Sequence, residues 1–98
     1  MDGLPYADDA PLFPIPPRTG IRDHGDPALV RPTWLADGTE AWAPIYVGDE
    51  RAWLQCVAFE VTARDALVVS STPVRVYEVR VKLRDLRVPR CSPFAEKV

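Results

Sequence analysis

The stretch AWAPIYVGDERAWLQCVAFEVTAR, residues 41–64, decides the fold of this chain. Residues 41–47 alternate between two faces with a period of two, which predicts a β-strand. Pro44 has no amide donor for a second neighbouring strand, so we expect this strand at the edge of a sheet. A turn signal at residues 48–50 separates it from a second, longer strand over residues 52–64. The two runs together predict a β-hairpin.

The longer strand is apolar on both of its faces near the middle. One face carries Trp53, Val57, Phe59 and Val61, and the other carries Leu54, Cys56 and Ala58. A strand that is buried on both faces is typical of a strand that bends around a small barrel.

Shorter strands follow as far as residue 90. A turn at residues 64–65 leads to a short strand at residues 67–69, and a further alternating run covers residues 74–83. Residues 83–86 fit a single tight turn of 3₁₀ type before a last short strand at residues 87–89. The sequence therefore predicts an all-β, five-stranded small barrel.

The first third of the chain has a different character. Residues 1–33 hold seven of the eleven prolines and show no sustained apolar period, which favours an extended backbone. We therefore divide the chain into an acidic, proline-rich arm (residues 1–37), a β-barrel (residues 38–93) and a tail (residues 94–98). The charge also differs between the two halves of the chain, because residues 1–50 carry a net charge of −6 and residues 51–98 a net charge of +4.

The arm contains large apolar and proline residues in a stretch that cannot form a core of its own. They are the candidate partner-binding residues Leu12, Phe13, Ile15, Pro16 and Pro17. Exposed groups of this kind mark an interaction site. Two interpretations remain open: the arm binds another protein, or it covers the apolar face of its own barrel.

Two short segments resemble a known class of domain. Trp53-Leu54-Gln55-Cys56-Val57 is similar to the second strand of small Src-homology-type (SH3-like) barrels of the Tudor and Agenet kind. The segment at residues 81–87, VKLRDLR, is similar to the closing part of those barrels. The resemblance implies an SH3-like barrel over about half of the chain. It also implies an aromatic cage for methylated lysine or arginine, but the candidates, Trp42, Tyr46, Trp53 and Tyr77, do not have the spacing of a cage.

A run of basic residues near the carboxyl end is the second candidate site. Six bases and two acids lie between residues 75 and 90, and the bases are Arg75, Arg80, Lys82, Arg84, Arg87 and Arg90. A basic strand face binds phosphates in a salt-dependent way, so one interpretation is a nucleic-acid-binding module. The overall net charge of −2 favours the other interpretation, in which the face is solvated or meets an acidic protein.

The sequence does not favour an enzyme. His24 is the only histidine, and its loop, with Asp23 and Asp26, has no second cluster of metal ligands. A nucleophile would need a base from the arm, and no glycine-rich phosphate loop is present. We expect no cofactor, a buried thiol at Cys56 and a loop thiol at Cys91.

We therefore predict a non-enzymatic structural or interaction protein whose arm docks the barrel onto a larger protein assembly. The abundance of Arg, Ala, Val, Asp and Pro resembles proteins of high-GC actinobacteria and their phages, so a virion component, on the capsid surface or joining head to tail, fits. A phage protein that binds and redirects a host protein is an alternative. The start of the sequence is unlike a signal peptide, and no run is long enough to span a bilayer. We expect the protein in the cytoplasm or in a virion assembled there.

Overall fold

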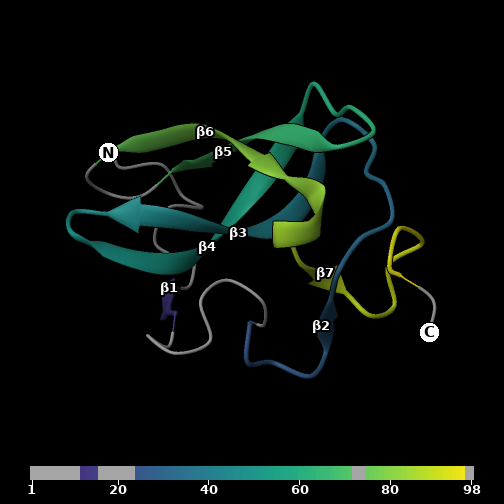
Figure 1. Ribbon diagram of the computed structural model, residues 1–98, viewed down its shortest axis with the longest axis horizontal. Coiled ribbons are helices and arrows are strands. Elements are labelled where there is room, and N and C mark those ends of the chain that lie inside the picture. The colour runs from purple at the N-terminus through teal and green to yellow at the C-terminus, as the bar shows by residue number, and fades with distance from the viewer. Residues whose placement is uncertain (1–11, 16–23, 72–74, 97–98) are drawn as a thin grey trace, which may run out of the picture.

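The structure is a computed structural model that describes residues 12–15, 24–71 and 75–96. These residues form an all-β fold with one short 3₁₀ helix and no α-helix (Figure 1). The elements are β1 (Leu12–Pro14), β2 (Leu29–Val30), β3 (Thr39–Val47), β4 (Glu50–Phe59), β5 (Asp65–Ser71), β6 (Val76–Lys82), the 3₁₀ helix η1 (Leu83–Asp85) and β7 (Val88–Pro89).

A five-stranded antiparallel sheet makes up most of the fold. β4 is its central strand, and β3 pairs with β4 along nearly its whole length, from Thr39 opposite Ala58 to Val47 opposite Glu50. The other edge of β4 is shared by β1 near its start and by β5 near its end. β6 then follows β5, so the order is β1-β4-β5-β6.

The β3–β4 hairpin confirms the predicted strand at residues 41–47 and the turn after it. Its loop has two residues, and Gly48 takes a φ of 66°, a left-handed conformation that favours glycine. The predicted strand over residues 52–64 is shorter at its end, because β4 stops at Phe59. The backbone turns at Glu60, which has a φ of 46°.

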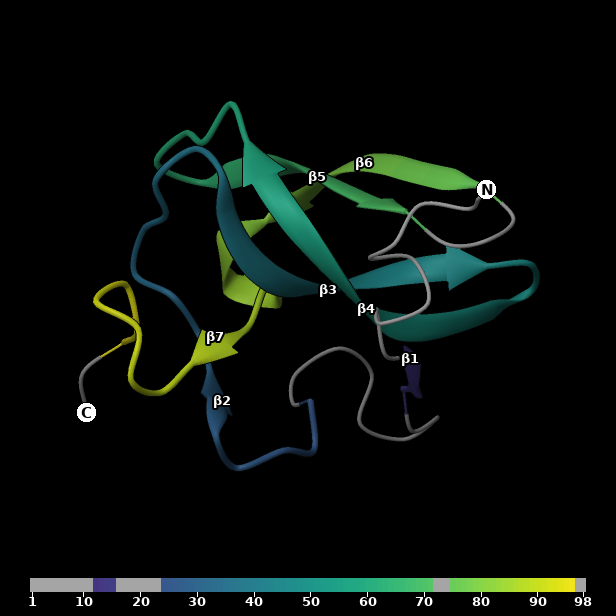
Figure 2. The ribbon, with the colours of Figure 1, turned by 180° about the vertical axis from the view of Figure 1, so that it is seen from behind.

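A small second sheet lies at one end of the molecule, where β2 and β7 run side by side in both ribbon views (Figures 1 and 2). Val30 pairs with Val88, and an isolated bridge joins Pro32 to Ala95. η1 lies between β6 and β7, which confirms the predicted 3₁₀ turn. Its first amide, on Leu83, donates to the carbonyl oxygen of Arg64 at 2.8 Å.

The core lies on one face of the five-stranded sheet. Much of that face consists of alanine, at positions 41, 43, 52, 58 and 66, with Leu54 and Val68 between them. Small side chains allow the segment that follows β6 to approach closely, and its Leu86 and Val88 are fully buried there. Leu35, from before β3, and Ala95, from the end of the chain, belong to the same cluster.

The sheet is not closed into the barrel that the sequence predicts. Among the described strands, β6 pairs with β5 alone, and β3 and β6 form no ladder with each other. The chain leaves β6 through η1 and reaches β3 only at one bridge, where Arg87 and Trp42 exchange both backbone hydrogen bonds. From Pro44 onward, the edge of β3 that faces β6 therefore has no strand paired with it among the described residues. We call the gap between this edge of β3 and the free edge of β6 the seam.

Candidate interaction site

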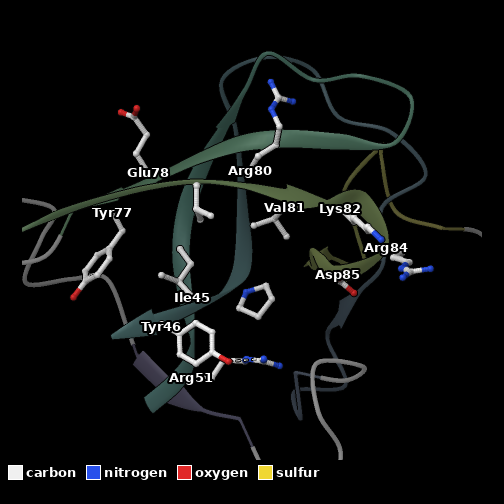
Figure 3. Close-up of a pocket in the computed structure, with 12 residues that line it drawn as sticks. Ile45, Tyr46, Arg51, Tyr77, Glu78, Arg80, Val81, Lys82, Arg84 and Asp85 are labelled. Carbon is white, nitrogen blue, oxygen red and sulfur yellow. Dashed lines mark hydrogen bonds between the residues drawn. The ribbon is translucent and has the colours of Figure 1, made fainter. Parts of the chain in front are cut away.

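A groove with a volume of about 560 Å³ runs along the seam (Figure 3). One wall comes from the hairpin, with residues 44–46 of β3 and Arg51 of β4. The other wall comes from residues 77–82 of β6, and η1 adds Arg84 and Asp85 at one end. The groove thus lies between two strand edges that have no partner among the described residues.

The apolar floor of the groove is the core face of β6. The register places Val79 opposite Val68 and Val81 opposite Ala66, so these valines point to the same side as the buried core. Val68 has no exposed surface, whereas Val79 is 40% exposed. The seam therefore leaves part of the inner face of the sheet open to solvent.

The hairpin wall carries a paired aromatic and basic group. The Nη2 atom of Arg51 donates to the hydroxyl oxygen of Tyr46 at 2.8 Å. The guanidinium of Arg51 also lies over the Tyr46 ring, 5.0 Å from its centre. These two contacts hold both side chains at the rim of the groove, although Tyr46 is 60% exposed.

The groove keeps an excess of positive charge. Lys82 and Arg84 are exposed at the η1 end, where Asp85 is half-buried. Arg80 and Glu78 point away from the groove (Figure 3).

Arg80 is also neutralised by acids on its own side of the sheet. Its guanidinium binds Asp65 at 2.6 Å and Glu60 at 3.4 Å. The hydrogen bond from Arg80 lowers the pKa of Asp65 and raises that of Arg80 itself. Arg80 therefore contributes little net charge to a ligand in the groove.

The remaining bases of the predicted face lie in different places. Arg75 precedes β6, with its guanidinium 5.9 Å from the centre of the Tyr77 ring. Arg87 is buried and donates to the carbonyl oxygens of Arg84 and Leu86. Arg90 donates to the carbonyl oxygen of Pro27, beside the small sheet. The structure brings Lys82 and Arg84 to the groove, together with Arg51, which the sequence did not single out.

The described part of the arm lies on the chain's own sheet. β1 adds to the edge of β4, and the amide of Ile15 donates to the carbonyl oxygen of Arg51 at 3.3 Å. Phe13 is 44% exposed, and its ring packs against His24 and Trp42 with centre distances of 5.0 and 5.4 Å. Pro16 and Pro17 lie outside the described residues.

His24 is the centre of a packed aromatic cluster on the outer face of the hairpin. Its ring centre lies 4.8 Å from that of Trp42 and 5.3 Å from that of Trp53. Both ring nitrogens are buried, and neither has a hydrogen-bond partner among the described residues. Burial lowers the pKa of His24, nearby Asp26 raises it, and Arg87 lowers it further.

The four candidate cage aromatics do not come together. Trp42 and Trp53 belong to the cluster around His24, whereas Tyr46 and Tyr77 line the groove. Trp53 has no exposed surface, so its ring is not available to a ligand. The structure therefore offers a groove between strand edges and no cage around a single side chain.

A second hollow, of about 520 Å³, lies between His24 and the small sheet, with Arg87, Arg90 and Glu96 in its lining. Across the part of the chain that the structure describes, no three His, Cys, Asp or Glu side chains are grouped as metal ligands. Cys56 is a buried free thiol and Cys91 an exposed one, as the sequence predicted. In the same residues, no helix has the length and apolar character needed to cross a bilayer.

No protein-family model, curated protein or solved structure matches this chain.

Proposed function

We propose that this is a non-enzymatic interaction protein that docks onto a larger protein assembly, and that an extended segment of the partner lies in the groove along the seam. The observation that carries the proposal is the 40% exposure of Val79 on the core face of β6. A core-facing valine is exposed there because the described strands supply no neighbour across the seam.

The physics of an open sheet supports this function. Alternate residues of an edge strand direct their amide and carbonyl groups away from the sheet, and an added strand satisfies them. Such strand addition is a common mode of peptide recognition, in which backbone hydrogen bonds give affinity and side-chain contacts give specificity. A domain of this size has a small core, and a partner that covers Val79 and Val81 would enlarge it.

The finer description of the protein is part of the same proposal. With a partner strand in the seam, the five strands of the sheet and the added strand would close into a small SH3-like barrel of the Tudor kind. A virion component on the capsid surface or at the head–tail joint is the assembly that we favour, since the composition resembles that of proteins from high-GC actinobacteria and their phages. The alternative is a phage protein whose partner is a host protein that it binds and redirects.

Nucleic-acid binding is the second candidate function. The observation that favours it is the group of exposed bases Arg51, Lys82 and Arg84 around one groove. Burial of Arg87 and the ion pairs of Arg80 weigh against it, because they remove two of the six bases from a phosphate-binding face.

A charge placed in the seam tests the proposal against a matched control. Val79→Asp introduces a carboxylate on the floor of the groove, whereas Val76→Asp introduces one at a 55% exposed position near the start of the same strand. Each tagged full-length variant is expressed in the native source, and the size of the complex that contains it is measured by size-exclusion chromatography. We expect Val79→Asp to elute as a free chain and Val76→Asp to stay in its assembly.

Circular dichroism shows whether both variants keep their strands, so that loss of folding is separated from loss of docking. If folded Val79→Asp remains in the assembly, the groove is not the docking site. If the unmodified chain binds generic DNA with a steep salt dependence and no protein, the nucleic-acid function replaces the proposed one.

A further inference from the structure

We infer that the groove selects an acidic extended segment of a partner protein, in which apolar side chains alternate with Asp or Glu. The inference rests on the proposed function, that the groove binds an extended chain, and adds the chemistry of that chain. It depends on two features of the groove walls: the face on which the apolar groups lie and the end at which the bases gather.

The alternation of apolar and polar residues in the ligand follows from the two faces of the sheet. A strand added beside β6 would direct every second side chain toward Ile45, Val79 and Val81, which lie on the core side. The side chains between them would point to the outer side, where Tyr46 and Lys82 lie by the same register. Apolar residues therefore suit the first set, and polar residues suit the second.

The negative charge of the ligand is inferred from the uneven distribution of ionic groups along β6. At one end, Lys82 and Arg84 are exposed, and neither takes part in an ion pair among the described residues. Arg51 adds a third base at the rim. Asp85 is the only acid among the lining groups at the η1 end. Carboxylates on the ligand would meet complementary charge there.

The position of the acids in the ligand is also determined. Glu78 lies on the outer side toward the start of β6, opposite Val69, so an acid beside it would meet like charge. The acids of the ligand therefore belong at the end that lies beside Lys82 and Arg84. β6 has seven residues, so the matching segment is about seven residues long, or roughly 23 Å.

The chain's own amino-terminal segment is the competing occupant. Residues 1–11 contain Asp2, Asp8 and Asp9 together with Leu4 and Tyr6, and they lie outside the described residues. Neutralising these acids in the full-length chain, by Asp2→Asn, Asp8→Asn and Asp9→Asn, separates the two occupants.

Two synthetic peptides that differ only in charge provide the test. Each has about nine residues, to exceed β6 slightly, with valine at alternate positions. The acidic peptide carries Glu and Asp between the valines of one half and Gln and Asn between those of the other half, whereas the neutral peptide carries Gln and Asn throughout. The full-length protein, labelled with ¹⁵N, is titrated with each peptide, and amide shifts are followed by NMR at low and high salt.

We expect the acidic peptide to bind roughly tenfold more tightly than the neutral one at low salt, and the difference to shrink at high salt. Shifted amides should cluster in residues 44–46 and 76–82. The double variant Lys82→Glu, Arg84→Glu should remove the preference. Arg31 is an exposed base beside the small sheet. Arg31→Glu is the control for a reversed charge away from the groove, and it should keep the preference for the acidic peptide.

Each other outcome overturns the inference in a distinguishable way. Equal binding of both peptides in the groove would refute acid selection and leave the proposed strand-binding function intact. Binding of neither peptide would refute the inference, and the Val79→Asp experiment would still decide the proposed function. If the acidic peptide binds only to the variant with Asn at positions 2, 8 and 9, the occupant is the chain's own segment.

Discussion

The guanidinium carbon of Arg87 lies 5.2 Å from the centre of the Trp53 ring, with both side chains buried. Trp53 thus has a cation on one side, and His24 contacts it in the aromatic cluster. The backbone of Arg87 also bridges to Trp42, which fixes the last segment of the chain against β3. This contact therefore joins the carboxyl-terminal segment to the hairpin.

Arg87→Ala is expected to destabilise the fold strongly. The change removes the stacking on Trp53 and leaves the carbonyl oxygens of Arg84 and Leu86 without their donor, a loss of about 2–4 kcal/mol. Urea unfolding followed by tryptophan fluorescence measures the change. Arg31→Ala, at an exposed site, should cost no more than about 0.5 kcal/mol. Equal unfolding midpoints for the two variants would show that Arg87 is not a structural residue.

Stability should fall as the pH is lowered below 6.5, the ordinary pKa of histidine. Burial lowers the pKa of His24 in the folded state, so His24 is protonated at a higher pH in the unfolded chain than in the folded one. Lowering the pH therefore stabilises the unfolded state relative to the folded state. The loss in free energy of unfolding grows from pH 6.5 down to the lowered pKa of His24, and there is no such loss above pH 6.5. Urea unfolding at pH 7.5 and pH 5.5, at constant ionic strength, measures it.

His24→Phe serves as the matched variant for this pH dependence. Phenylalanine keeps an aromatic ring among Phe13, Trp42 and Trp53 and cannot be protonated, so the variant should lose stability less steeply between pH 7.5 and 5.5. At pH 7.5 its stability should lie within about 1.5 kcal/mol of the original, since neither ring nitrogen hydrogen-bonds to any residue that the structure describes. An unchanged slope would mean that another group titrates.

The two thiols should react at very different rates. Cys91 is exposed, whereas burial raises the pKa of Cys56 to about 12, and its Sγ atom contacts the carbonyl oxygen of Ala41 at 3.3 Å. Iodoacetamide at pH 8 should add one group to the folded protein and a second only in denaturant, as mass spectrometry would show. Rapid double modification under native conditions would contradict the buried position of Cys56.

Alternation in the sequence was enough to predict the larger strands. The period of two in residues 41–47 and Pro44 predicted an edge strand. β3 pairs with β4, and among the described residues its other side has only a single bridge. The end of β4 was missed, because a left-handed conformation at Glu60 has no signal comparable to that of a glycine. β1 and β2 were also missed, since strands of two or three residues show no period.

The candidate site was less predictable. A base in an alternating strand is normally placed outward, because burial of an unpaired charge is costly. Arg87 is instead buried. It donates to the carbonyl oxygens of Arg84 and Leu86 and stacks on Trp53, and only the tertiary structure brings it to Trp53. Arg51 and Tyr46 reach the groove only through the hairpin register, which brings them opposite each other.

Hydrogen exchange of the β6 amides tests the central claim, that the seam accepts an added strand, most directly. In the free full-length protein, amides at alternate positions from Val76 to Lys82 should exchange quickly, because they point away from β5. With saturating acidic peptide, we expect those same amides to become protected while the amides of β2 and β7 stay unchanged. Unaltered exchange along β6 when the peptide is bound would contradict the account.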